Sequence, residues 1–249
     1  MMIKITEHCS MGCTHCMNNA TPNNKHMDFD TFKKVIGFQK EYGGSFVIIT
    51  GGEPTEHPEF QKFLRYTIQE LKQTFITITT NGLWLQNNYN FVKQLLNCHD
   101  KYVMFQVTND KRYYPTPLDE SHPVYQLGNV VLCTEIEHIY PQGRAADNNL
   151  EWSSKGCKCF NIRAILHQIN IKNLRVAIGM LSVMGKFCTP HIDIYGNIKL
   201  GESDLCPVCS NISKIHDDIV KDILNFKCDK CRHVNQALSQ EHRKIIGEV

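Results

Sequence analysis

Strand-like and helix-like segments alternate along residues 1 to about 148, and this alternation constrains the fold more than any other feature of the sequence. Runs of β-branched and apolar residues predict strands, and apolar residues at helical spacing predict helices between them. The predicted strands are residues 2–6, 46–50, 75–79, 102–108 and 129–134. The predicted helices begin at Asp28 or Asp30, at His57–Pro58 and near Phe91. This order favours an α/β fold with a parallel sheet, which is either doubly wound or part of a barrel.

Three cysteines follow directly after the first predicted strand. Cys9, Cys13 and Cys16 have the spacing C-x3-C-x2-C. Three thiolates this close in sequence suit three irons of a [4Fe–4S] cluster and leave the fourth iron without a protein ligand. Taken alone, the spacing also fits a zinc site or a ferredoxin fragment. A second motif, Gly-Gly-Glu-Pro at Gly51–Pro54, ends the second predicted strand.

Composition narrows the class of protein. The chain has 249 residues, of which 42% are hydrophobic and 21% charged, as expected for a globular protein. A net charge of +2 gives no electrostatic reason to expect nucleic acid or a membrane surface as partner. We find neither a run of about 20 apolar residues that would span a membrane nor a signal peptide, so we expect a cytoplasmic protein.

The 12 cysteines indicate metal or cluster binding rather than disulfides in such a compartment. Seven of them lie from Cys157 onward, which predicts a boundary between residues 1–148 and a second region, residues 149–249. The isolated Cys98 and Cys133 are expected to pack in the core. Histidines beside helix ends, His57 among them, are expected to be solvated.

With both motifs in order at strand ends, the chain resembles the radical S-adenosylmethionine (SAM) enzymes. The resemblance implies a partial (β/α)6 TIM-like barrel with a small C-terminal cysteine-rich module of a β-hairpin and a helix. It implies a [4Fe–4S] cluster on Cys9, Cys13 and Cys16, whose open iron is chelated by SAM. The Gly51–Pro54 turn would bind the SAM amino group. In such barrels the active groups gather at the carboxyl ends of the strands.

The resemblance also implies roles for single residues. His15 stands where the family often has an aromatic residue against the adenine, and Asn109 stands where the family often has an acid near the ribose. Arg144 is expected to pair with the SAM carboxylate; the alternative is a surface arginine. The catalytic base would be Arg144 or a residue of the 110–116 segment, which is expected to be a loop or lid. Thr80 and Asn81 would contact SAM or substrate, or serve only the turn. The complete predicted SAM-binding set is His15, Thr50, Gly51, Gly52, Glu53, Pro54, Thr80, Asn81, Thr108, Asn109 and Arg144.

The C-terminal cysteines resemble the Twitch module, a shortened SPASM domain that holds one auxiliary [4Fe–4S] cluster. The pattern is Cys188-x12-Gly201-x4-Cys206 around a hairpin that turns at Gly196–Asn197, followed by Cys228-x2-Cys231 after a helix. The implied ligands are Cys188, Cys206, Cys228 and Cys231. Replacing Cys188 with Cys209 instead gives a zinc-ribbon spacing. Cys157 and Cys159 have no assigned role.

A saturated auxiliary cluster favours oxidation of a substrate by two electrons. The length and spacing are similar to those of the 2-deoxy-scyllo-inosamine dehydrogenases, which implies a small-molecule substrate. The alternatives are a peptide-modifying radical SAM enzyme, a glycyl-radical activating enzyme and a non-catalytic iron–sulfur or zinc scaffold. A flavodoxin- or ferredoxin-type protein is the expected reductant.

Overall fold

The computed structural model describes residues 1–42, 46–99, 101–136, 139, 142–150, 190–201 and 206–225. Five cysteines with predicted or unassigned roles lie outside these residues: Cys157, Cys159, Cys188, Cys228 and Cys231. Within the described residues, no helix is long and apolar enough to cross a membrane.

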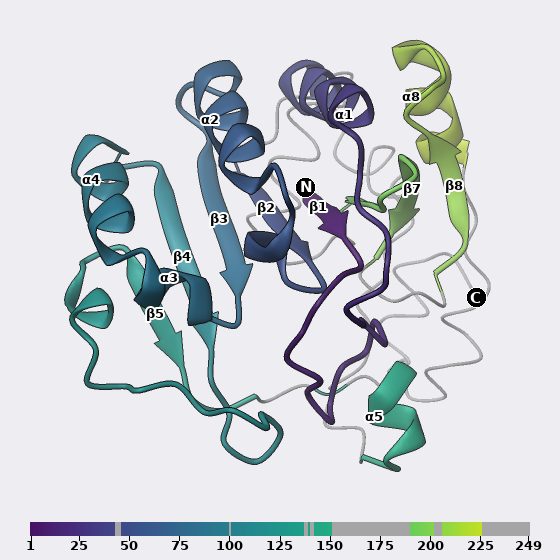
Figure 1. Ribbon diagram of the computed structural model, residues 1–249. Helices are drawn as coiled ribbons and strands as arrows, with labels where there is room; N and C mark the ends of the chain where they lie inside the picture. The colour runs from purple at the N-terminus through teal and green to yellow at the C-terminus, as the bar shows by residue number, and fades with distance from the viewer. Residues whose placement is uncertain are drawn as a thin grey trace, which may run out of the picture.

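One sheet organises the described chain (Figure 1). Its eight strands run in the order β5-β4-β3-β2-β1-β6-β7-β8. Every neighbouring pair from β5 to β6 is parallel, whereas the β6–β7 and β7–β8 pairs are antiparallel. The bounds are β1 Met2–Thr6, β2 Phe46–Gly51, β3 Phe75–Thr80, β4 Val103–Thr108, β5 Val130–Cys133, β6 Pro190–Ile192, β7 Asn197–Leu200 and β8 Val208–Asn211.

The helices are α1 Phe29–Tyr42, α2 Phe60–Glu70, α3 Leu83–Asn87, α4 Tyr89–His99, α5 Gly143–Asp147 and α8 His216–Asn225. Short 3-10 helices span Pro54–Glu56 and Pro123–Gln126. Asp28, rather than Asp30, caps α1: its carboxylate accepts from the Thr31 backbone N–H at 2.8 Å and from the Thr31 hydroxyl at 2.7 Å. The helix predicted to open at His57–Pro58 begins only at Phe60, after the first 3-10 helix.

Helices α1, α2 and α4 lie on one side of the sheet (Figure 1). Strands β1 to β5 follow each other in sequence order across the sheet, without the reversal of a doubly wound fold. Right-handed crossovers between strands in that order place their helices on one face. The fold is therefore the mixed α/β, mostly parallel sheet of a partial TIM-like barrel. The hairpin β6–β7 extends this same sheet past β1, and the boundary at residue 148 stays a prediction.

The main core lies between the sheet and these helices. Ile3, Ile49, Ile78 and Phe105 are register neighbours on β1 to β4 and are all fully buried. Phe32 of α1 stacks on a ring of α2, Phe63, at 4.2 Å between centroids.

Two expectations about burial were wrong. His57 is buried, with 5% of its surface exposed, because it packs between the Phe63 ring and the backbone of Met27. Cys98 lies near the end of α4 with its side chain exposed rather than in the core. Cys133 is half-buried at the end of β5.

Candidate functional site

The predicted cluster ligands lie in the segment between β1 and α1, residues 7–28, which we call the cysteine loop. Cys9 and Cys13 are buried and Cys16 is half-buried. Met11, Ala20 and the ring of Tyr114 pack with them in a small apolar cluster, separate from the main core. The loop therefore holds two buried thiols and one half-buried thiol in an apolar cluster next to the carboxyl ends of the strands.

The thiols fit an iron–sulfur cluster better than a single ion. Burial, with a smaller contribution from the neighbouring thiols, raises the pKa of Cys9 to about 11 and that of Cys13 to about 12. A metal that binds thiolates would reverse this penalty. No three Cys, His, Asp or Glu side chains among the described residues are arranged to hold one metal ion. Ligands of a cluster bind separate irons, so they do not have to converge on one point.

The Gly51–Pro54 turn packs directly on the cysteine loop. The backbone N–H of Gly52 donates to the Thr6 carbonyl at 2.7 Å, and the N–H of Glu53 donates to the His8 carbonyl at 2.8 Å. A Cβ atom on Gly52 would stand 2.4 Å from the His8 carbonyl oxygen, and one on Gly51 would stand 2.5 Å from that of Thr6. Only glycine permits this approach, which explains the paired glycines of the motif.

The Glu53 side chain braces this turn against the end of β3. One carboxylate oxygen accepts from the Thr55 N–H, the Thr55 hydroxyl and the Thr80 hydroxyl at 3.0, 2.5 and 2.7 Å. The other oxygen accepts from the Asn81 N–H at 2.6 Å. Burial raises the pKa of Glu53, although these donors favour the ionised form. Both carboxylate oxygens accept hydrogen bonds from the protein, so Glu53 is placed to shape the turn.

Glu56, which sequence reasoning missed, ties the following 3-10 helix to the cysteine loop. Its carboxylate accepts from the Ser10 N–H at 2.9 Å and from the Ser10 hydroxyl at 2.7 Å. It also lies 3.1 Å from the His8 ring. The only feature of the sequence that could have indicated this role is the position of Glu56 three residues after Glu53.

Arg144 contacts the backbone of the cysteine loop. Its Nε donates to the Cys13 carbonyl at 2.9 Å and its Nη1 donates to the Ala20 carbonyl at 2.7 Å. Gly143 has a positive φ of 53°, and a Cβ there would stand 2.8 Å from the Cys16 carbonyl oxygen. The Gly143–Arg144 pair thus packs on the backbone carbonyl groups of the loop and holds the loop in shape. Arg144 is therefore not a surface arginine. Two of its guanidinium nitrogens hold the backbone of the cysteine loop.

The segment after β4 covers the cysteine loop. The Thr14 N–H donates to the Tyr113 carbonyl at 3.0 Å, and the His15 ring lies between Tyr113 and Tyr114, with centroids 5.1 and 5.5 Å away. The Tyr114 hydroxyl hydrogen-bonds that of Thr108. His15, predicted to stack on adenine, therefore packs on two protein rings of the 110–116 segment, for which a loop or lid was predicted but no contact with His15. The place of the two tyrosines after a predicted strand end was the available signal.

The remaining predicted residues also gather at this edge. Asn109 is fully buried and its Oδ1 accepts from the Leu118 N–H at 3.0 Å, so it shapes the segment after β4. Asn81 uses its Oδ1 to accept from the Leu83 N–H at 3.1 Å. Its Nδ2 is buried and has no hydrogen-bond partner within the described residues. That donor is the strongest sign of a missing ligand among these residues.

Only part of the predicted auxiliary site is described. Cys206 is buried, and a Cβ on Gly201 would stand 2.7 Å from its sulfur, so the glycine of the pattern gives the thiol its space. The Cys209 thiol donates to the Ile198 carbonyl at 3.2 Å, and its side chain packs against the main core. This placement favours Cys188 over Cys209 as the fourth ligand, which stays a prediction.

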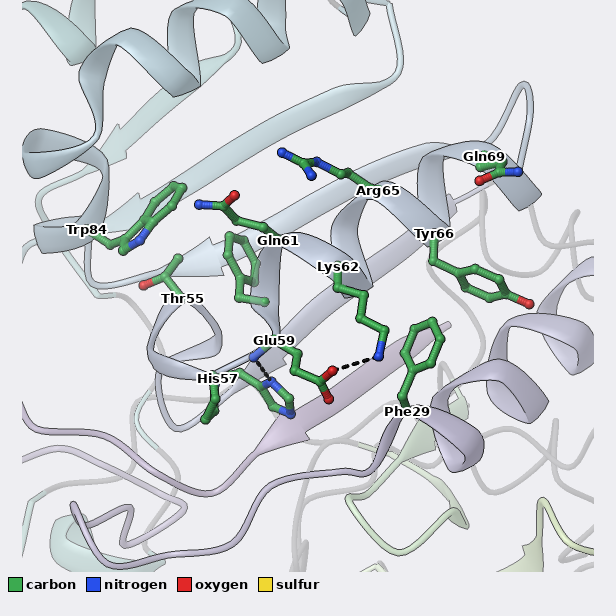
Figure 2. Close-up of a pocket in the computed structure, with 12 residues that line it drawn as sticks. Phe29, Thr55, His57, Glu59, Gln61, Lys62, Arg65, Tyr66, Gln69 and Trp84 are labelled. Carbon is green, nitrogen blue, oxygen red and sulfur yellow. Dashed lines mark hydrogen bonds and ion pairs between the residues drawn. The ribbon is translucent and has the colours of Figure 1, made fainter.

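A separate hollow of about 670 Å³ lies over α2, on the helix side of the sheet (Figure 2). Phe29, Tyr66 and Trp84 contribute rings, and the Glu59–Lys62 pair crosses it at 2.6 Å. Among the described residues that line it there is no cysteine and no residue of the Gly51–Pro54 turn, although Thr55, which donates to Glu53, is one of them.

Comparison with known proteins identifies the domain. The radical SAM superfamily profile matches residues 3–120, which contain both motifs and β1 to β4. Residues 3–120 are thus similar to the radical SAM superfamily domain. This similarity implies SAM and one [4Fe–4S] cluster, and the three thiols of the cysteine loop fit such a cluster.

The curated relatives include GTP 3′,8-cyclases. The Vibrio vulnificus protein is 20% identical over 157 residues, covering 55% of this chain and 47% of the relative. The Chlorobaculum tepidum protein is 30% identical over 84 residues, covering 33% and 26%. This chain therefore spans less than half the length of these relatives.

Two solved structures share the fold over most of the chain. BtrN in complex with AdoMet and 2-DOIA has a TM-score of 0.56 and 18% identity, covering 99% of this chain and 90% of that one. Streptococcus suis SuiB bound to precursor peptide SuiA has a TM-score of 0.55 and 14% identity, covering 92% and 67%. At these identities the likeness shows the fold.

Proposed function

We propose that this radical SAM enzyme oxidises a small molecule by two electrons. The observation that carries the proposal is the cysteine loop, in which two buried thiols and one half-buried thiol share an apolar cluster and the loop backbone is hydrogen-bonded to the Gly51–Pro54 turn. Cys9, Cys13 and Cys16 would hold the cluster. Cluster and SAM together supply a reductive cleavage that yields methionine and a 5′-deoxyadenosyl radical, which takes a hydrogen atom from the substrate.

The protein's own residues hold this site in shape. Glu53 fixes the turn, and Arg144 fixes the carbonyl groups of the loop, so the thiols keep their positions when the site is empty of substrate. Tyr114 and Met11 pack on the thiols and exclude water. The buried donor of Asn81 is free for a SAM oxygen. Excluding water protects a reactive radical from side reactions.

We further propose an auxiliary [4Fe–4S] cluster on Cys188, Cys206, Cys228 and Cys231, which accepts the second electron as the substrate loses a proton. The placement of Cys206 and Cys209 supports this ligand set. BtrN, which shares the fold, is bound to AdoMet and 2-DOIA, and we take it as the parallel for a small-molecule substrate; SuiB, bound to precursor peptide SuiA, is the parallel for a peptide substrate as the second candidate. A flavodoxin- or ferredoxin-type protein in the cytoplasm would supply the first electron.

The test is anaerobic reconstitution, followed by iron and sulfide analysis and an assay for 5′-deoxyadenosine after addition of SAM and dithionite. The wild type should bind about eight irons in two clusters and form 5′-deoxyadenosine. Cys13→Ala should lose SAM cleavage and keep the auxiliary cluster. Cys98→Ala, which changes an exposed cysteine on α4, is the matched control and should behave as the wild type. Cleavage retained in Cys13→Ala would contradict the mechanism; four irons with one zinc would remove the auxiliary electron acceptor.

A further inference from the structure

The sheet has two faces of opposite chemistry. On the face toward α1, α2 and α4, the register row Ile3–Ile49–Ile78–Phe105 is entirely apolar. We call the opposite face, which points away from these helices, the inner face. The next register row lies on it and consists of Lys4, Thr50, Thr79 and Gln106, which we call the polar band. Lys4 is in register with Thr50, and Thr79 with Gln106; the Ile49–Ile78 pair places Thr50 beside Thr79.

The polar band lies just below the strand ends that carry the cysteine loop and the Gly51–Pro54 turn. One row further down, Met2, Ile48, Thr77 and Met104 form a mostly apolar floor. Parallel sheets packed on both faces are normally apolar on both, and barrel interiors are normally filled with branched apolar side chains. The polar band is therefore built to face a polar molecule.

Hydrogen-bonding capacity remains unused along this band. Thr50, Thr79 and Gln106 are half-buried. Neither threonine hydroxyl has a hydrogen-bond partner among the residues that the structure describes. Within the described part of the chain, the Gln106 side chain hydrogen-bonds only the Cys133 sulfur, at 3.9 Å. Half-buried hydroxyl and amide groups of this kind are suited to the hydroxyl groups of a ligand.

Lys4 gives the band a charge. Its side chain is 4% exposed and lies on the first strand, below the cysteine loop. Its ammonium donates to the Asn18 amide oxygen at 3.1 Å, and the Glu7 carboxylate lies farther away, at 3.7 Å. Neither the band nor the floor contains a carboxylate. The ammonium thus makes one printed hydrogen bond, to Asn18, and a longer ion pair with Glu7, so it has donor capacity for an anionic group that approaches more closely than Glu7.

We propose that the polar band binds a small, hydroxyl-rich substrate that carries a carboxylate or phosphate, and that Lys4 selects the anionic group. This inference rests on the proposed function, because it names the substrate class of the same site. A molecule of the sugar acid or sugar phosphate type matches the cation, the hydroxyl groups and the amide in one row.

The test is ligand-detected NMR with the reconstituted, SAM-loaded protein and three probes: glucuronate, glucose 6-phosphate and glucose. Because a hydrogen bond to a charged group contributes about 1.5–3 kcal/mol, at least one anionic probe should bind roughly tenfold or more tightly than glucose. Lys4→Gln, which keeps a donor for Asn18 but removes the charge, should abolish that preference. Lys4→Arg should retain it. Lys33→Met, which changes a half-exposed lysine on α1, is the matched control.

Thr79→Val provides a test that leaves Lys4 and its loop contact intact. It should weaken all binding probes about two- to tenfold, whereas Thr77→Val in the floor should change binding less. Equal binding of glucose and both anions to the wild type, or no binding of any probe, would overturn the proposal. So would a tenfold loss of SAM affinity in Lys4→Gln by equilibrium dialysis, because the anionic partner would then be SAM itself. If the protein bound the anions selectively but did not cleave SAM, the proposed oxidation would be wrong, whereas the proposed binding site for an anionic ligand would still be supported.

Discussion

Replacing Glu53 with glutamine tests whether this carboxylate braces the turn or binds SAM. All four donors around Glu53 come from the protein, and two of them are backbone N–H groups that cannot reverse their direction. Glutamine offers one oxygen and one NH2 group. If the NH2 group takes the place of the oxygen 2.6 Å from the Asn81 N–H, a donor faces a donor in a fully buried site.

The loss in the free energy of unfolding that we expect for Glu53→Gln follows from these contacts. One hydrogen bond to a charged acceptor is lost, and a buried N–H is left unsatisfied, which together cost about 3–5 kcal/mol. For a chain of this size, each kcal/mol lowers Tm by about 2–4 °C, so Tm should fall by roughly 6–20 °C.

The assay is anaerobic thermal unfolding of the reconstituted protein followed by circular dichroism, with SAM binding measured on the same samples. Glu59→Gln is the control: it breaks the Glu59–Lys62 surface pair at 2.6 Å and should cost less than about 1 kcal/mol. A Glu53→Gln protein with wild-type Tm and abolished SAM binding would refute the reasoning and make the carboxylate a SAM ligand.

Three further predictions address single contacts. Cys188→Ala should lose about four irons while Cys209→Ala keeps them; the reverse iron contents would favour the zinc-ribbon set. Gly52→Ala should cost about 1–3 kcal/mol by overpacking against the His8 carbonyl, measured as a lower Tm, whereas Gly128→Ala, with nothing within 4 Å, should not. Burial lowers the pKa of His57, so the unfolded chain binds the proton more readily; stability should be complete above about pH 6.5 and fall below it. Scans at pH 7.5 and 5.5 that showed no greater loss in the wild type than in His57→Gln would contradict this last prediction.

Local features of the site could be predicted because they depend on neighbours in sequence. The spacing of Cys9, Cys13 and Cys16 after a strand was sufficient to predict the cysteine loop, and the paired glycines predicted a close backbone approach. The expectation of a solvated His57 was wrong because its burial depends on Met27, 30 residues away. Whether a histidine beside a helix is buried depends on what packs over it, which periodicity does not report.

The sequence by itself determined the alternation of strands and helices, the cysteine ligand pattern and the radical SAM resemblance, since each depends on spacing along the chain. Only the tertiary structure decided what the charged groups do. Glu53 meets the end of β3 28 residues later, and Arg144 meets the Cys13 carbonyl across 131 residues. The polar band likewise exists only once four strands are in register. Hydrogen bonds require distances near 3 Å, and only the folded sheet brings such distant groups that close.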